Sequence, residues 1–126
     1  MIAVGDHYFK PVPELLIRAS CPFGGGLGGS HQELCGVVGG GTLLLGALGG
    51  RVSSTENDVL VRDLTCRFRE RFIAATGNAQ CQAILDGLPD EERRCLPIIT
   101  EGIRILVALI EEAAREHPFT NPLLLS

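Results

Sequence analysis

Residues 30–50 read SHQELCGVVGGGTLLLGALGG, and this stretch decides the fold. Ser30 is followed three residues later by Glu33, a capping box that predicts a helix starting at Ser30. The helix is expected to run to about Leu48 and to stop at the glycine pair that follows. Because no charged residue interrupts it after Glu33, we predict a central glycine-rich helix that is apolar on all sides.

The interior glycines of this helix need compensation from tertiary contacts. Each costs about 1 kcal/mol relative to alanine in the middle of a helix. Gly36 and Gly40 have the small-xxx-small spacing of helices whose backbones nearly touch. We therefore expect close contact with another helix or with a cofactor along this face.

The rest of the chain predicts further helices and no persistent strand. Apolar residues recur at helical spacing, and Gly77 and Asn78 suit the end of one helix and the cap of the next. Pro97 is expected to kink the last helix or reset its start. The helices are predicted over residues 13–20, 56–76, 79–85 and 90–116, with core stripes at Leu60, Leu64, Phe68 and Phe72 and at Ile99, Ile103, Leu106 and Ile110. The predicted fold is all-α, a compact bundle of about four to five helices around the glycine-rich one.

Length and composition describe one folded domain. The chain has 126 residues, of which 45% are hydrophobic and 21% charged, enough to bury one core and too few for two. We expect residues 13–117 to form a single helical domain. It is preceded by an N-terminal stub, residues 1–12, and followed by an apolar tail, residues 118–126, that is expected to dock on a partner.

Charge and aromatic content argue against nucleic acid and membrane as partners. The net charge is −4, and the chain has five Phe, one Tyr and no Trp, so it offers neither electrostatic attraction nor stacking surface. The longest uncharged run, residues 34–50, is short and rich in glycine for a membrane span. No signal peptide is recognisable, so we expect a cytoplasmic protein whose thiols stay reduced.

The five cysteines fall at different places on the predicted helices. Cys95 extends the stripe of the last helix, Cys81 shares a face with Ile84, and Cys35 lies in the second turn of the glycine-rich helix. All three are predicted to point inward. Cys66 falls among charged residues and is predicted to be peripheral, whereas Cys21, at the mouth of the glycine loop, could be either.

Spacing by itself does not identify a site. The chain has no C-x-x-C, no haem-attachment motif and no paired zinc spacing, and buried cysteines often serve only as packing. A dinucleotide-like pattern runs from Gly24 to Gly29, but no buried strand precedes it, so we expect no nucleotide. The signal is the convergence of three inward thiols from three helices, which is how metal and cluster sites are built.

The ordered set of motifs resembles the C-GCAxxG-C-C family, small all-helical proteins regarded as redox-active from their cysteines. The resemblance covers about residues 13–113. It rests on Pro13-Glu14-Leu15-Leu16, the loop Phe23-Gly24-Gly25-Gly26-Leu27-Gly28, Glu33-x-Cys35-Gly36 with Gly40, Leu64-x-x-x-Phe68, Thr76-Gly77-x-x-x-Cys81 and Cys95.

The resemblance implies four site cysteines, of which this chain has three, at Cys35, Cys81 and Cys95. The first family cysteine belongs upstream of Pro13 and is absent here, and Val37 stands where the family motif has alanine. The family is also similar to part of split-Soret cytochromes, which carry haems and an iron–sulfur centre, but haem is not expected here. A three-thiolate site could be completed by Cys21, His31, an exogenous ligand or a neighbouring subunit. The glycines expected to line the site are Gly26, Gly28, Gly36 and Gly40.

Three functions follow as hypotheses. The first is an iron–sulfur cluster or another thiolate-bound metal at Cys35, Cys81 and Cys95, for electron transfer or sensing. The second is a thiol–disulfide protein without metal, and the third is a non-catalytic assembly subunit whose cysteines only pack. We also expect a homodimer and a redox partner protein, because the glycine-rich helix and apolar tail offer more surface than one chain covers.

Overall fold

The computed structural model describes residues 1–116, which form six α-helices and one short 3₁₀-helix, in agreement with the predicted all-α bundle. The elements are α1 (Ile2–Phe9), α2 (Glu14–Ser20), η1 (Cys21–Phe23), α3 (Gly36–Gly49), α4 (Val59–Thr76), α5 (Cys81–Asp86) and α6 (Leu96–Glu116). The predicted tail, residues 118–126, and His117 lie outside the described residues.

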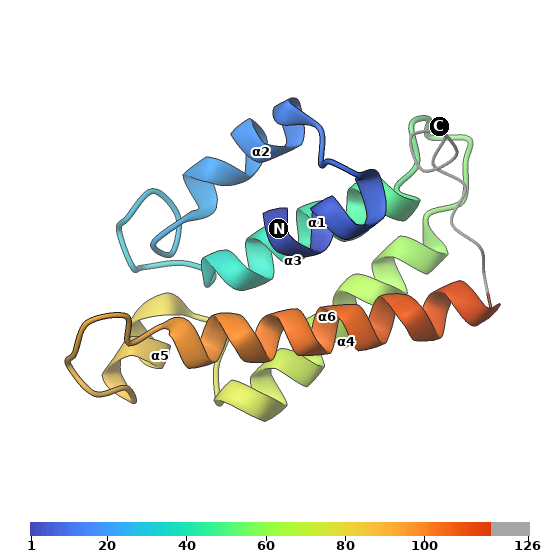
Figure 1. The fold of residues 1–126 in the computed structure, drawn as a ribbon. Helices are drawn as coiled ribbons and strands as arrows, with labels where there is room; N and C mark the ends of the chain where they lie inside the picture. Colours follow the sequence, from blue (N-terminus) through green and yellow to red (C-terminus); the bar gives the residue numbers. More distant parts are fainter. Residues whose placement is uncertain (117–126) are drawn as a thin grey trace.

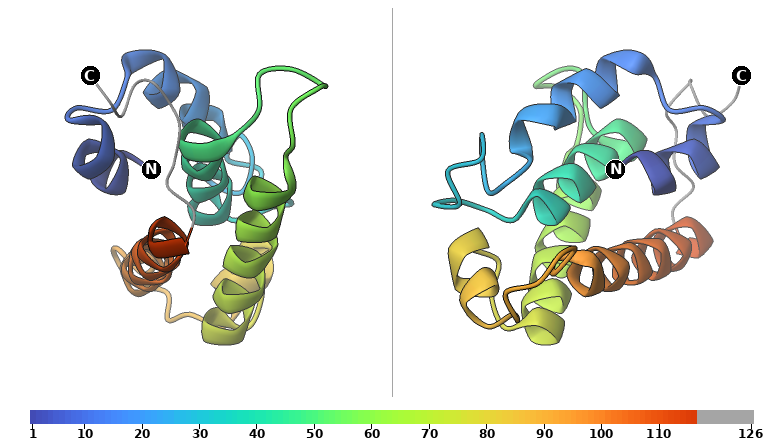
Figure 2. Two further views of the ribbon diagram at one scale, coloured as in Figure 1. Left: turned by 90° about the vertical axis from the view of Figure 1, so that its right-hand side faces the viewer. Right: turned by 60° about the vertical axis from the view of Figure 1, so that its left-hand side comes forward.

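Helix α3 lies at the centre of the bundle (Figure 1). It packs against α4 and α6 on one side and against α2 and η1 on the other. Figure 2 shows α4 and α6 crossing beneath α3, with α1 beside it. The prediction of a central glycine-rich helix is therefore confirmed.

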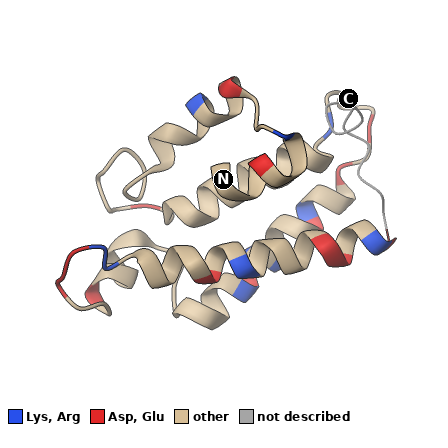
Figure 3. Cartoon of the chain, viewed as in Figure 1, with Lys and Arg blue, Asp and Glu red and all other residues tan. Residues whose placement is uncertain are grey.

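The core lies where α3, α4 and α6 meet. Its fully buried side chains are apolar, and no polar side chain is buried among the described residues. They are Leu44, Leu45, Leu48, Leu64, Phe68, Phe72, Leu109 and Ile110. The predicted stripe of α4 faces this core, because Leu64, Phe68 and Phe72 are buried and Leu60 is partly buried against it. Charged side chains lie mainly on α4, α6 and the loop before α6, and α3 carries none (Figure 3).

Two interior glycines of α3 permit the close contacts that the sequence required. A Cβ at Gly41 would lie 2.8 Å from Cζ of Phe68, and one at Gly39 would lie 2.7 Å from Cδ1 of Phe23. Any side chain at these positions would push the aromatic ring away. Packing against aromatic rings thus offsets the low helix propensity of glycine.

The start of α3 differs from the prediction. Cys35 is the N-cap and the helix begins at Gly36, so Ser30 does not cap it. The Ser30 hydroxyl instead donates to the Gly26 carbonyl at 3.1 Å. Residues 24–35 form a glycine loop whose backbone is held by long-range hydrogen bonds, and this tertiary pairing overrides the local capping signal.

Other helix boundaries differ from the predicted ones by a few residues. Helix α6 begins at Leu96 rather than Asp90, because Pro97 in its first turn resets the start as predicted. Gln80 rather than Asn78 caps α5, its side chain accepting from the Ala83 amide at 2.6 Å. Gly77 ends α4 with φ of 92°, as predicted.

The N-terminal stub forms a helix that the sequence analysis did not predict. Helix α1 buries Val4, and the Asp6 carboxylate accepts a hydrogen bond from the Val12 amide at 3.0 Å. Met1, Tyr8 and Phe9 pack against the main core. Residues 1–12 are thus part of the same packed unit.

Candidate functional site

A cavity of about 540 Å³ opens between α1, the glycine loop, α3 and the start of α6. Four of the five cysteines line it, and no charged side chain of residues 1–116 does. The rest of the lining consists of glycines and apolar side chains, with Ser20 as the only other polar one among the described residues. The thiols are Cys21, Cys35, Cys81 and Cys95.

Each of the three predicted thiols stands at the start of a helix. Cys35 is the N-cap of α3, Cys81 is the first residue of α5, and Cys95 immediately precedes α6. The amide of Ile99 donates to the carbonyl of Cys95 at 3.0 Å, the bond expected of an N-cap. The positive ends of the two long helices, α3 and α6, therefore face the region where Cys35 and Cys95 lie.

A single antiparallel bridge aligns Cys35 with Cys81. Leu34 pairs with Gln80, the Cys35 amide donates to the Ala79 carbonyl at 2.7 Å, and the Cys81 amide donates to the Glu33 carbonyl at 2.9 Å. Cys35 and Cys81 thereby become diagonal neighbours on one face of the bridge. This contact was missed in the sequence because one isolated bridge produces no alternating pattern.

Gly26 makes the room that Cys81 occupies. Its φ is 61°, a left-handed conformation, and a Cβ there would overlap Cβ of Cys81 and lie 2.9 Å from its sulfur. The Gly26 carbonyl accepts from the Glu33 amide at 3.3 Å, which anchors the loop beside the bridge. Only glycine satisfies both the backbone angle and the contact.

The other predicted glycines are placed differently. Gly36 and Gly40 line the cavity with Gly26, whereas Gly28 does not. Gly28 has φ of 62°, and a Cβ there would meet no atom within 4 Å. Gly28 thus serves the turn of the loop and not the wall of the cavity.

The three thiols influence one another electrostatically. Partial burial raises the pKa of Cys35, an effect opposed by the amides of Val37 and Val38 and reinforced by Cys95. Burial also raises the pKa of Cys81, an effect reinforced by Cys35 and Cys95 and opposed by the positive charge of Arg94. Each pair of the three is therefore close enough to interact, and a nearby cation would favour their thiolate forms.

The prediction that all three thiols point inward is wrong for Cys95. Cys35 and Cys81 are half-buried, but Cys95 is exposed. The reason is that α6 begins after Cys95, so its side chain does not continue the buried stripe. Ile99 of the same stripe is also 42% exposed, and both residues line the cavity.

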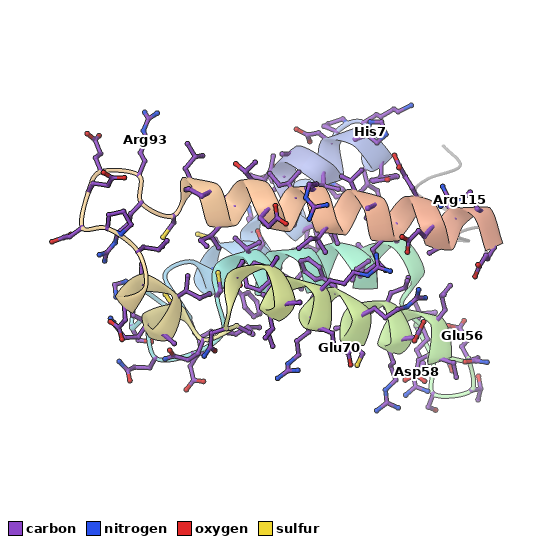
Figure 4. The ribbon with its side chains drawn as sticks, turned by 90° about the horizontal axis from the view of Figure 1, so that it is seen from below. His7, Glu56, Asp58, Glu70, Arg93 and Arg115 are labelled. Carbon is purple, nitrogen blue, oxygen red and sulfur yellow. The ribbon has the colours of Figure 1, made fainter. Side chains whose placement is uncertain are left out.

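His31 and Cys66 lie away from the cavity lining. His31 does not line the cavity, but its backbone carbonyl holds the glycine loop to α5 by accepting a hydrogen bond from the Gln82 amide at 3.0 Å. Cys66 is exposed, as predicted, and its thiol lies 3.4 Å from Oε1 of Glu70. In Figure 4, Glu70 projects from the outer side of α4, while other sulfur atoms gather near the start of α6.

The donor set has the right chemistry for a soft metal, but its ligand geometry is not formed. Thiolates select iron–sulfur clusters, Cu(I) and Zn²⁺. Among residues 1–116, no three side chains of His, Cys, Asp or Glu are arranged to hold one metal ion. Side chains at the cavity would have to turn toward a common centre to bind one.

We expect the raised pKa values of Cys35 and Cys81 to appear in their alkylation by iodoacetamide. Because only the thiolate reacts, their rates should keep rising with pH after the same cysteines in the denatured chain have levelled off. Peptide mass spectrometry over about pH 7–11 measures both profiles. Because the pKa of each thiol is higher in the folded than in the denatured chain, its full contribution to the free energy of unfolding is present below the ordinary thiol pKa. That contribution is lost as the pH rises through the pKa of the folded chain. Coincident profiles in the folded and denatured chains would contradict the assignment.

Comparison with known proteins supports the resemblance. No curated protein and no solved structure matches the chain significantly. Within residues 1–116, no helix has the length and apolar character that crossing a membrane requires. One family model matches residues 1–109, a range that includes α1 as well as the segment from Pro13 onward. The chain therefore belongs to the family described as "putative redox-active protein (C_GCAxxG_C_C)".

Proposed function

We propose that this protein exchanges electrons at the cysteine-lined cavity, where Cys35, Cys81 and Cys95 hold an iron–sulfur cluster or another redox-active soft metal. The observation that carries the proposal is the convergence of these three thiols, from three helix starts, on one cavity whose described lining has no charged side chain. Membership of a redox-active family agrees with it. Such a group would supply reversible electron transfer for an electron carrier or a sensor.

Three features of the chain's own residues support thiolate binding. The amides of Val37 and Val38 favour the thiolate of Cys35, and the positive charge of Arg94 favours that of Cys81. The apolar lining limits water around the partly buried sulfurs of Cys35 and Cys81, which is one of the factors that set a redox potential. Gly26 keeps the loop backbone close to Cys81, so that backbone dipoles lie near its sulfur.

The spacing across the bridge also helps to decide whether Cys35 and Cys81 share a metal or form a disulfide. Diagonal neighbours across antiparallel strands have Cα atoms about 7–8 Å apart, beyond the usual range of about 4.4–6.8 Å for a disulfide. A bond between Cys35 and Cys81 would require the backbone to move. Two thiolates sharing one metal can span a wider gap.

A thiol–disulfide function is the second candidate, favoured by the mutual proximity of Cys95 to both other thiols. Two thiols would lose two electrons and two protons while the disulfide of a partner protein is reduced to two thiols. Cytoplasmic location, the homodimer and the redox partner stay predictions from the sequence.

Purification without air tests the proposal. We expect coloured protein containing iron and sulfide, and loss of both in Cys35→Ser, Cys81→Ser and Cys95→Ser. Cys66→Ser is the matched control, because that thiol is exposed on the outer side of α4, and it should keep the metal. Colourless protein that loses two thiols on mild oxidation would favour the disulfide alternative. Colourless protein with unchanged thiols would leave the cysteines as packing residues.

A further inference from the structure

We infer that Cys21 supplies the fourth thiol of this site, from a position that is not one of the four in the family pattern. The inference rests on the proposed function. Cys21 lines the same cavity as Cys35, Cys81 and Cys95, although it lies on a different segment from all of them. Residues 1–12, upstream of Pro13, contain no cysteine.

The backbone of Cys21 is held firmly at the junction of α2 and η1. Its amide donates to the Arg18 carbonyl, and its carbonyl accepts from the Gly24 amide at 3.2 Å. Pro22 restricts the next backbone torsion. The thiol is therefore presented to the cavity from a fixed backbone position.

Besides its cysteines, the described lining of the cavity offers two side chains that could bind a metal, the Met1 thioether and the Ser20 hydroxyl. Its described lining contains no Asp, Glu or His, and His31 lies outside it. Cys21 and Cys95 are exposed, while Cys35 and Cys81 are half-buried. The set thus combines two exposed thiols with two partly buried ones, whose side chains would have to turn toward a common centre to share a metal.

Cys21 follows α2, which lies on the opposite side of α3 from α5, the helix that begins with Cys81, and from α6, the helix that Cys95 precedes. Figure 1 shows α2 on one side of α3, with α5 and α6 on the other. The main contacts of α2 and η1 are with α3 and with each other. A metal shared by Cys21 and Cys95 would therefore link two parts of the fold that otherwise have few contacts.

Titration of the reduced full-length protein with Cd²⁺, without air, tests the inference. Sulfur-to-cadmium charge-transfer absorbance and a count of protected thiols report how many cysteines bind, independently of any activity. We expect four bound thiols in the wild type and in Cys66→Ser. Cys21→Ser should bind with three and with at least about tenfold lower affinity, since even second-sphere changes cost about 10–100-fold. Because Cys21 is exposed, this variant should fold, which circular dichroism verifies.

Hydrogen exchange gives a second readout. Cd²⁺ should slow exchange of amides in residues 14–23 in the wild type and in Cys66→Ser, and leave them unchanged in Cys21→Ser. Wild-type affinity, thiol count and protection in Cys21→Ser would overturn the inference, and the proposed function would stand if Cys35→Ser still lost binding. If Cd²⁺ binding survived in Cys35→Ser, Cys81→Ser and Cys95→Ser, both proposals would fail.

Discussion

Replacing Gly26 by alanine is expected to lower the free energy of unfolding by about 2–4 kcal/mol. Part of the loss arises because a left-handed residue with a side chain costs about 1–2 kcal/mol. The rest arises because the new Cβ would overlap Cβ of Cys81 and lie 3.0 Å from Cα of His31, so that the bridge must shift. Urea unfolding measures the stability, and the alkylation rate of Cys81 measures its displacement.

Gly28→Ala is the matched control for this prediction. Gly28 has nearly the same φ, 62°, but a Cβ there would meet no neighbouring atom. It should therefore lose only the backbone contribution, about 1–2 kcal/mol, and leave Cys81 unchanged. Equal losses in the two variants would show that the contact between Gly26 and Cys81 has no energetic weight.

Phe68→Ala is expected to destabilise the fold by about 3–5 kcal/mol. The Phe68 side chain is 0% exposed, and it packs against Gly41 of α3 and, at 6.4 Å between ring centroids, against Phe72. It also lines the cavity, so its removal should enlarge the cavity as well as weaken the contact between α3 and α4. Thermal and urea unfolding report the loss.

A double-mutant cycle separates the contact with Gly41 from general loss of the ring. Gly41→Ala should destabilise the wild type, because its Cβ would lie 2.8 Å from Cζ of Phe68, and should be much less harmful in Phe68→Ala. Val52→Ala, at a side chain that is 93% exposed, should change stability by less than about 0.5 kcal/mol. Strict additivity of Gly41→Ala and Phe68→Ala would refute the proposed packing.

Most of the fold could be predicted because a helix is encoded by residues that lie close together in the sequence. The apolar stripe of α4, its glycine cap and the core role of α3 all follow from residues within a few turns of one another. The peripheral position of Cys66 follows in the same way, from the charged residues around it on the helical wheel. The boundaries of the helices were predicted less accurately than their existence. At Ser30, for example, long-range hydrogen bonds of the backbone outweigh the local capping signal.

The site depends on contacts that no local pattern records. The sequence alone determined an all-helical bundle with a glycine-rich centre and singled out Cys35, Cys81 and Cys95, because periodicity and spacing act over one or two helical turns. Only the tertiary structure decided that Glu33–Cys35 pairs with Ala79–Cys81, that Cys21 lines the cavity while His31 does not, and that Cys95 is exposed. These outcomes reflect competition between segments far apart in the chain, where backbone pairing and close packing outweigh local propensity.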